Sequence, residues 1–299
     1  KALREKTGVG MLECKKALVE TNGDMEKAIF FLRERGVAAA EKKAGRIAAE
    51  GMVFPMIDEN QTAVLIEVNT ETDFAAKNEK FTSFVKEIAS IIAKNNPLDL
   101  EALEKLPYGD GTTVGDELKN MILTIGENIK LRRFVRSEAE NNSVFAVYNH
   151  HLAGKIGTLV KLTVSDNLKD NHEIFAFGKD LCMGVAANRP EYISREDIPK
   201  ERLNQEKEIL KAQVINEGKP EAIAEKIVTG KIGKFYELVC LVDQPYIRDQ
   251  KIKVSEKLRA LEKELGGEIT VADFIRYECG EGIEKKSDDF ASEVESMLK

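Results

Sequence analysis

The sequence has few of the residues that metal sites and disulfide scaffolds require. Among its 299 residues are no Trp, three His and four Cys. The cysteines form no C-x-x-C pair, which at this length indicates reduced thiols packed as small apolar residues. Two of the histidines, His150 and His151, are neighbours and would face opposite sides of a strand. We therefore expect no metal site.

Long apolar runs and nucleotide-binding loops are also missing. No run approaches the roughly 18–20 apolar residues of a membrane span, and no signal peptide opens the chain, so we expect a cytoplasmic protein with no membrane partner. The glycine-rich residues 109–115 lack the G-x-G-x-x-G spacing, and no Walker A loop or G-x-S-x-G elbow is present. These absences predict no bound cofactor and no catalytic set.

The net charge of −7, from 45 Lys and Arg against 52 Asp and Glu, gives the chain no general attraction to phosphate backbones. We therefore expect no direct nucleic-acid partner. The charge is uneven, because residues 1–50 carry 11 Lys and Arg against 8 Asp and Glu. A basic arm of +3 thus precedes a body of −10, and a small basic helical arm is typical of an interaction module.

Apolar spacing predicts a compact three-helix bundle over residues 1–36, with a helical connector to residue 50. Asp24 is a candidate N-cap for the third helix, and Gly36 its expected end. The first helix contains Leu3. The later stripes comprise Met11, Cys14 and Leu18, then Met25, Ala28, Ile29 and Leu32.

Beyond residue 50 a β-β-α unit occurs twice. Residues 52–57 and 62–68 form a predicted hairpin, followed by a loop over residues 69–78 and a helix that ends near Asn96-Pro97. The hairpin recurs at an offset of 94, as Phe54 and Tyr148 illustrate, and the helix recurs at an offset of 93. Two related subdomains, each a sheet backed by helices, are the economical explanation.

The remaining segments complete the second subdomain and interrupt it. We predict helices over residues 118–129, 254–265 and 288–299, and β structure over residues 235–242 and 270–278. Between them lies a helical hairpin, an antiparallel coiled coil that is either a structural spur or a site of dimerisation or partner contact. Its stripes comprise Leu203, Leu210 and Val214, then Ile223, Ile227 and Val228.

The predicted fold class is α+β, with an N-terminal three-helix, UBA-like bundle. The expected divisions are the bundle and connector (1–50), core subdomain N (51–137), core subdomain C (138–192 and 236–276), the inserted coiled coil (193–235) and a C-terminal helical module (277–299).

The two copies differ between hairpin and helix, where the first carries Asp73-Phe74 and the second reads Thr163-Val164-Ser165-Asp166-Asn167-Leu168. One interpretation is that Phe74 folds back as a lid on its own helix, with Asp73 as the cap. The other is an exposed wedge, presented on a rigid support for insertion into a partner.

Several motifs resemble those of the elongation factor Ts family. Thr72-Asp73-Phe74-Ala75-Ala76-Lys77-Asn78 is similar to the family's T-D-F-V-A-K-N, with Ala75 in place of Val. Residues 7–18 are similar to its T-G-A-G-M-M-D-C-K-K-A-L. Residues 126–129, 218–220 with 223–226, and 280–284 also resemble family motifs, so the resemblance runs along the chain from Lys1 to Lys299 in one order.

The resemblance implies a guanine-nucleotide exchange factor for elongation factor Tu, with no covalent chemistry of its own. Phe74 would insert between two helices of the GTPase's G domain, with Asp73 helping to hold it there. Magnesium and phosphate binding would loosen, and GDP would leave. Thr72, Lys77 and Asn78 complete the implied loop site.

Other implied contacts lie outside this loop. The G domain would be contacted by the terminal helix and by the bundle around Met11, Leu12 and Lys15. The second subdomain would contact another domain of the partner. His150 stands where the family carries a His, but the family's His-Gly is replaced by His150-His151-Leu152, so a plain surface role stays open. A homodimer and a two-plus-two complex with the partner also stay open.

Two rival functions remain at this stage. One is a passive protein-binding scaffold without exchange activity. The other is an enzyme that uses Asp73 and Lys77 as acid and base, since side chains four residues apart on a helix can meet. No pocket-defining motif accompanies that pair.

Overall fold

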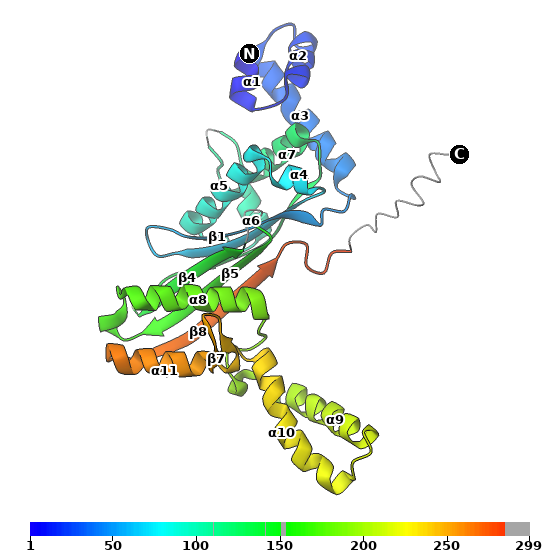
Figure 1. Cartoon of the computed structure of the whole chain (residues 1–299). Helices are drawn as coiled ribbons and strands as arrows, with labels where there is room; N and C mark the ends of the chain where they lie inside the picture. The colour runs from blue at the N-terminus through cyan, green and yellow to red at the C-terminus, as the bar shows by residue number, and fades with distance from the viewer. Residues whose placement is uncertain (110, 141, 151–153, 285–299) are drawn as a thin grey trace.

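The computed structural model describes residues 1–109, 111–140, 142–150 and 154–284, so the helix predicted over residues 288–299 lies outside the described residues. Figure 1 shows an elongated molecule, with the N-terminal helices at one end, two sheets in the middle and a helical hairpin at the other end. Helices and antiparallel strands together give the α+β class. Within the described ranges, no helix has the length and apolarity of a membrane span.

Three helices at the N-terminus, α1 (Ala2–Thr7), α2 (Met11–Glu20) and α3 (Met25–Lys43), enclose a small core that includes Leu3 and Leu32. Asp24 caps α3 by accepting the backbone N–H of Lys27 at 3.0 Å, as predicted. The expected end at Gly36 is wrong, because α3 continues to Lys43. Gly36 is buried where α3 packs against α7 (Val114–Ile125). The connector to residue 50 is therefore helical only in part.

Six strands form two antiparallel sheets of three. The first has the order β1 (Glu50–Ile57), β2 (Ala63–Thr70) and β3 (Ile129–Ser137), so the predicted first hairpin is confirmed. The second has the order β4 (Ser143–His150), β5 (Ile156–Val164) and β8 (Ile269–Glu278). The helix predicted over residues 118–129 is α7 instead, which ends at Ile125 because Gly126 adopts a left-handed φ of 86°.

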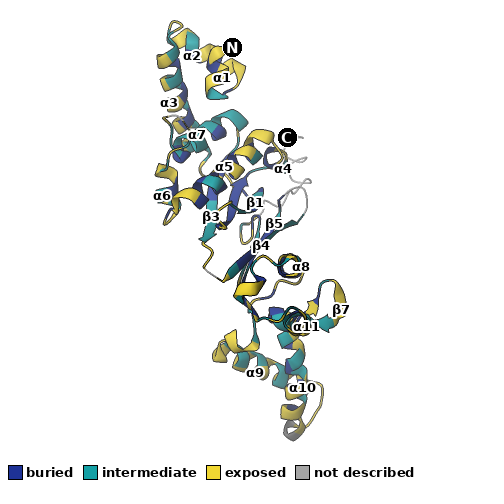
Figure 2. Cartoon of the chain, turned by 90° about the vertical axis from the view of Figure 1, so that its left-hand side faces the viewer, coloured by how far each residue is buried: buried dark blue, intermediate teal, exposed yellow. Residues whose placement is uncertain are grey.

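The sheets stack face to face, and helices cover their outer faces. On β2, Val64 and Ile66 pack on α5 (Glu79–Asn95) and α7, whereas Leu65 packs in the layer between the sheets. The outer face of the second sheet packs on α8 (His172–Asn188) and α11 (Val254–Leu265). Every residue of β2 is buried because both of its faces are covered. Figure 2 shows this buried interior along the strands.

The structure repeats where the sequence does. Helices α5 and α8 both begin after an asparagine N-cap, Asn78 and Asn171, and both end at a left-handed residue, Asn96 and Arg189. Each pair is separated by the predicted 93 residues. A short helix, α6 (Leu100–Lys105), follows α5.

A helical hairpin of α9 (Lys200–Asn216) and α10 (Glu221–Val239) projects from the second sheet's side of the molecule. The β structure predicted over residues 235–242 is wrong, because helical spacing continues to Val239. Ile223, predicted in the inner stripe, is instead exposed. Among the side chains of α10 that the structure describes, from residue 223 on, the buried ones are Ala224, Val228, Ile232, Phe235 and Val239.

Short elements join the hairpin to the body. The 3₁₀ helices η2 (Arg195–Asp197) and η3 (Leu241–Asp243) flank its base, followed by the small strands β6 (Pro245–Tyr246) and β7 (Asp249–Lys253). Arg195 donates to both carboxylate oxygens of Asp243, at 2.5 and 2.8 Å, and stacks on the ring of Tyr236. This bidentate pair ties the start of the hairpin to its end.

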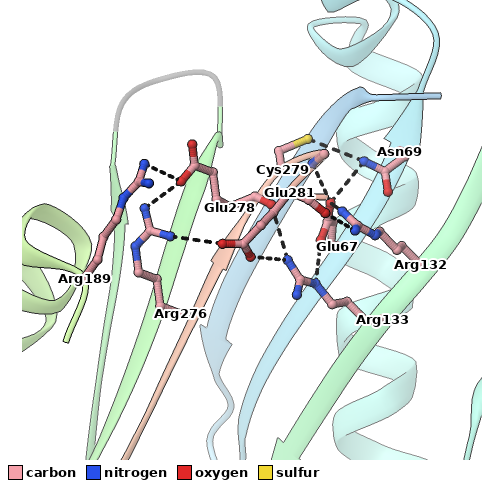
Figure 3. Close-up of polar contacts among 10 residues, drawn as sticks. Glu67, Asn69, Arg132, Arg133, Arg189, Arg276, Glu278, Cys279 and Glu281 are labelled. Atoms are coloured by element: carbon pink, nitrogen blue, oxygen red, sulfur yellow. Dashed lines mark hydrogen bonds and ion pairs between the residues drawn. The ribbon is translucent and has the colours of Figure 1, made fainter. Parts of the chain in front are cut away.

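A buried ionic cluster closes one end of the layer between the sheets (Figure 3). The Glu67 carboxylate on β2 is fully buried and accepts from Arg132 at 2.8 Å, Arg133 at 2.6 Å and the backbone N–H of Gly280 at 2.7 Å. A β-bulge makes this possible, because Glu67 pairs with Arg133 while Val68 pairs with Leu131. Arg132 is the extra residue, so two consecutive arginines reach one carboxylate.

Candidate functional site

Phe74 is presented to solvent on a one-turn helix, α4 (Asp73–Ala76). The loop predicted over residues 69–78 is therefore partly wrong, since β2 runs to Thr70 and a helical turn follows. The Phe74 side chain is 82% exposed, whereas the next residues, Ala75 and Ala76, are buried. The lid interpretation is wrong, because a lid would bury the ring.

The first turn of α4 is held by Thr72 and by an ion pair. Thr72, not Asp73, is the N-cap, and its hydroxyl accepts the N–H of Ala75 at 3.2 Å. Asp73 and Lys77 meet at 2.6 Å, and the hydrogen bond from Lys77 lowers the pKa of Asp73. A carboxylate with a lowered pKa is a weak proton acceptor near neutral pH, which disfavours the acid–base enzyme.

A second carboxylate, that of Glu127, braces this turn from the neighbouring segment. Glu127 lies between α7 and β3, and its Oε2 accepts the Thr70 hydroxyl and the Thr72 backbone N–H, both at 2.9 Å. Its Oε1 accepts the Thr72 hydroxyl at 2.7 Å. Since the Thr72 proton is directed to Glu127, a lone pair of the same hydroxyl is free to receive the N–H of Ala75.

Glu71 makes the reciprocal bond. Its Oε1 accepts the backbone N–H of Asn128 at 2.6 Å, while the amide of Asn128 donates to the carbonyl of Arg46 at 2.7 Å. The segments 70–72 and 127–128 thus exchange carboxylate-to-backbone bonds in both directions. The support of Phe74 is a cross-braced turn on a buried strand, which favours a single orientation of the helix.

The second copy of the repeat serves as an internal comparison. The 3₁₀ helix η1 (Asp166–Leu168) occupies the place of α4 there, with Asn167 at the position of Phe74. Asn167 is also exposed, and Leu168 is buried. The fold therefore places this position in solvent in both copies and does not require an aromatic ring.

The predicted bundle residues are exposed at the start of α2, with Met11 70% and Leu12 66% exposed. Lys15, also exposed, lines an apolar groove with Met11, and Met11 further lines a hollow of about 370 Å³ with Asn78 from the α4–α5 junction.

Two polar contacts bring the bundle to that junction. Lys80 of α5 donates to the carbonyl of Gly8, and Asn120 of α7 donates to the carbonyl of Thr7 at 3.1 Å. The structure thus places the Met11 end of α2 beside the segment that follows Phe74.

His150 lies in the other sheet, at the end of β4. Its Nδ1 is 2.9 Å from the Tyr148 hydroxyl. Its neighbour Asn149 donates to the carbonyl of Val53 on β1 at 3.3 Å, and the carbonyl of Gly154 accepts the N–H of Val53 at 2.6 Å, so this end of β4 borders the first sheet. His151 and Leu152, which depart from the expected His-Gly, lie outside the described residues.

Sequence reasoning assigned no role to Glu127 or Glu71. Glu127 stood in a motif, residues 126–129, but its partners are 55 and 57 residues away along the chain. A signal was present, because an acidic residue directly before a strand can cap the exposed N–H groups of a neighbouring turn. Without the pairing of β2 with β3, that partner turn could not be named.

Comparisons with known proteins agree over most of the chain. The family described as Elongation factor TS matches residues 71–281. The chain is 46% identical over 298 residues to Elongation factor Ts of Syntrophotalea carbinolica, covering 99% of this chain and 97% of that protein. The proteins of the same name from Clostridium acetobutylicum and Symbiobacterium thermophilum are 44% and 45% identical. These two alignments cover 100% and 98% of this chain, and 97% and 94% of the relatives.

Proposed function

We propose that this chain, which belongs to the elongation factor Ts family, drives GDP from elongation factor Tu by inserting Phe74 into that GTPase. Its family makes it a nucleotide exchange factor of translation elongation. The observation that carries this mechanism is an 82% exposed phenylalanine on a cross-braced turn. An exposed aromatic on a rigid support is suited to fill a pocket of a partner, because little ordering remains to be done on binding.

Insertion would weaken nucleotide binding by moving the groups that hold magnesium and phosphate in the partner. Asp73, ionised and held by Lys77, would fix the loop against the GTPase. This chain and the nucleotide would each weaken the binding of the other to the GTPase. Linkage requires that the factor be the same in both directions. Fresh GTP would then release this chain.

One side chain is too little for the whole effect. Nanomolar nucleotide binding corresponds to roughly 12 kcal/mol, whereas burying one Phe contributes about 1.5–3 kcal/mol. We therefore infer a distributed interface of at least the standard ~1,600 Å². Exposed Met11 and Leu12, with Lys15, would supply one further contact with the G domain, and His150 would supply another with a second partner domain.

We also propose that the chain works as the five units expected from its sequence, 1–50, 51–137, 138–192 with 236–276, 193–235, and 277–299. Separate apolar clusters support the first three units: one within the N-terminal helices and one beneath each sheet. The cluster at the base of the hairpin joins Ile198 and Phe235 to Val239, so it crosses the expected boundary between residues 235 and 236, as α10 does. The coiled coil stays either a structural spur or a site of dimerisation or partner contact. The contact of the terminal unit with the G domain follows only from the resemblance, and the stoichiometry with the partner stays open.

The test is release of a fluorescent GDP analogue from elongation factor Tu in stopped flow, comparing wild type with Phe74→Ala. We expect release to slow by roughly ten- to a hundredfold, the equivalent of the ~1.5–3 kcal/mol of burial that is lost. The variant should fold normally, because the ring is in solvent. Asn167→Ala, at the equivalent position of the second copy, is the matched control and should release GDP at the wild-type rate.

Two results would contradict the proposal. A wild-type rate for Phe74→Ala rejects the wedge. Binding to the GTPase with no acceleration of GDP release at substoichiometric amounts identifies the passive scaffold instead.

A further inference from the structure

We propose that Glu127 is the positioning residue of the exchange site, holding α4 in the orientation that presents Phe74. This inference rests on the function proposed above and adds to it a residue that does not itself need to touch the GTPase. It is carried by the contacts around Glu127 and by their absence from the second copy of the repeat.

Three hydrogen bonds converge on the half-buried Glu127 carboxylate, from Thr70, from the backbone of Thr72 and from its hydroxyl. Hydrogen bonds to an ionised acceptor are roughly twice as strong as neutral ones. The Thr72 hydroxyl passes this restraint to the first turn by accepting the N–H of Ala75. One carboxylate thus fixes both the entry of the chain into α4 and the hydroxyl that caps its first turn.

The second copy shows which part of this bracing the fold itself needs. Glu71 has a counterpart in Ser165, since Ser165 Oγ accepts the N–H of Glu268 at 2.9 Å as Glu71 accepts that of Asn128. This bond, which joins the middle strand to the start of the third strand, occurs in both sheets. It belongs to the architecture that the two copies share.

The Glu127 half of the brace has no such counterpart. Thr70 pairs with Ile129, and Val164 pairs with Ile269, so the place of Glu127 is taken by Gly267. A Cβ at Gly267 would lie 2.7 Å from Leu168, which fills the space by burying its side chain. The second copy therefore holds its turn by this apolar packing and by the Asn167 amide, which donates to the carbonyl of Gly266 at 3.3 Å, without a carboxylate.

Thr72, which donates to Glu127, also has no counterpart in the second copy. Glu71 corresponds to Ser165 at an offset of 94, while Asp73, the first residue of α4, corresponds to Asp166, the first residue of η1, at 93. Thr72 is thus the one residue inserted in the first copy. The inserted threonine, its carboxylate partner and the exposed phenylalanine occur together in one copy and are all missing from the other.

Glu127→Gln tests the inference, because the amide keeps the size of the side chain but loses its charge and one acceptor oxygen. We expect GDP release to slow about tenfold, while Ala75 exchanges its amide hydrogen faster. Thr72→Val should reproduce this loss, and Thr72→Ser, which keeps the hydroxyl, should restore it. Ser165→Ala removes the corresponding bond in the second copy and should leave release unchanged.

The decisive variant is the double Glu127→Gln, Phe74→Ala. If Glu127 acts through Phe74, the double variant releases GDP no more slowly than Phe74→Ala alone. Additive losses, or a wild-type rate for Glu127→Gln beside a slow Phe74→Ala, overturn the inference and leave the wedge intact. A wild-type rate for Phe74→Ala instead rejects the proposed function. Should Glu127→Gln unfold, Thr72→Val with Phe74→Ala forms the same cycle.

Discussion

Asp73 and Lys77 form an exposed pair whose effect should be local. The Lys77 hydrogen bond is the main cause that lowers the pKa of Asp73 below 3.8. Lys77→Gln removes that cation, so we predict that the pKa of Asp73 rises toward 3.8, measured by NMR titration of the carboxyl carbon. The thermal midpoint at neutral pH should not change, because exposed ion pairs contribute little to stability. An unmoved titration would show that Lys77 is not its partner in solution.

At the scale of single residues, the sequence identified Phe74 as unusual but did not identify Glu127, which supports its turn. Phe74 stood out because the second copy lacks an aromatic there, and its exposure excludes the lid. Glu127 could not be found in the same way. Its importance comes from bonds to Thr70 and Thr72, which exist only once β2 pairs with β3.

Helix α3 connects the N-terminal helices to the body of the molecule by packing on α7. Gly36 lies within α3, where an alanine Cβ would meet Lys119 at 3.4–3.6 Å, an ordinary contact distance. Since Gly costs about 0.8–1.0 kcal/mol relative to Ala within a helix, we predict that Gly36→Ala raises the free energy of unfolding by about 0.5–1 kcal/mol. Gly36→Leu should lower it instead, because the larger side chain must push α7 away. Urea denaturation of both variants measures this, and a destabilised alanine variant would mean that the helices lie closer than described.

Element boundaries were predictable where a local signal ends a segment. Asp24 caps α3, and α11 covers residues 254–265 as expected, because capping and periodicity are properties of the segment itself. The predicted end at Gly36 failed, since α3 continues through this glycine, which packs against Lys119 of α7. The bulge at Arg132 was not predicted either, since a third strand and a buried carboxylate are needed to explain it.

Across the whole molecule, Glu67 couples the two sheets. It joins Arg132 and Arg133 of the first sheet to the backbone of Gly280, which follows the last strand of the second (Figure 3). Arg133 also stacks on the ring of Tyr277, 4.1 Å from its centroid. The distance between the Phe74 turn on one sheet and His150 on the other therefore depends on this cluster and on the apolar layer beside it.

Stability should depend on pH through this carboxylate. Burial alone would raise the pKa of Glu67, but the Gly280 N–H and the two arginines outweigh it, so its pKa falls below 4.5. A lowered pKa means that the stabilisation is present above about pH 4.5 and is lost as the pH falls through the native value. We predict that Glu67→Gln costs about 3 kcal/mol near neutral pH, because Arg132 and Arg133 lose the buried carboxylate that they share and Arg133 keeps the more exposed Glu281 as its anionic partner.

The difference between wild type and Glu67→Gln should then shrink below pH 4.5, as the wild-type carboxylate takes up its proton. Urea denaturation at pH 7 and at steps below pH 4.5 measures it. Glu101→Gln, which removes an exposed carboxylate paired with Lys105 at 2.6 Å, is the control and should follow the wild-type curve. A constant difference across this range would mean that Glu67 stabilises the sheets by its shape and not by its charge.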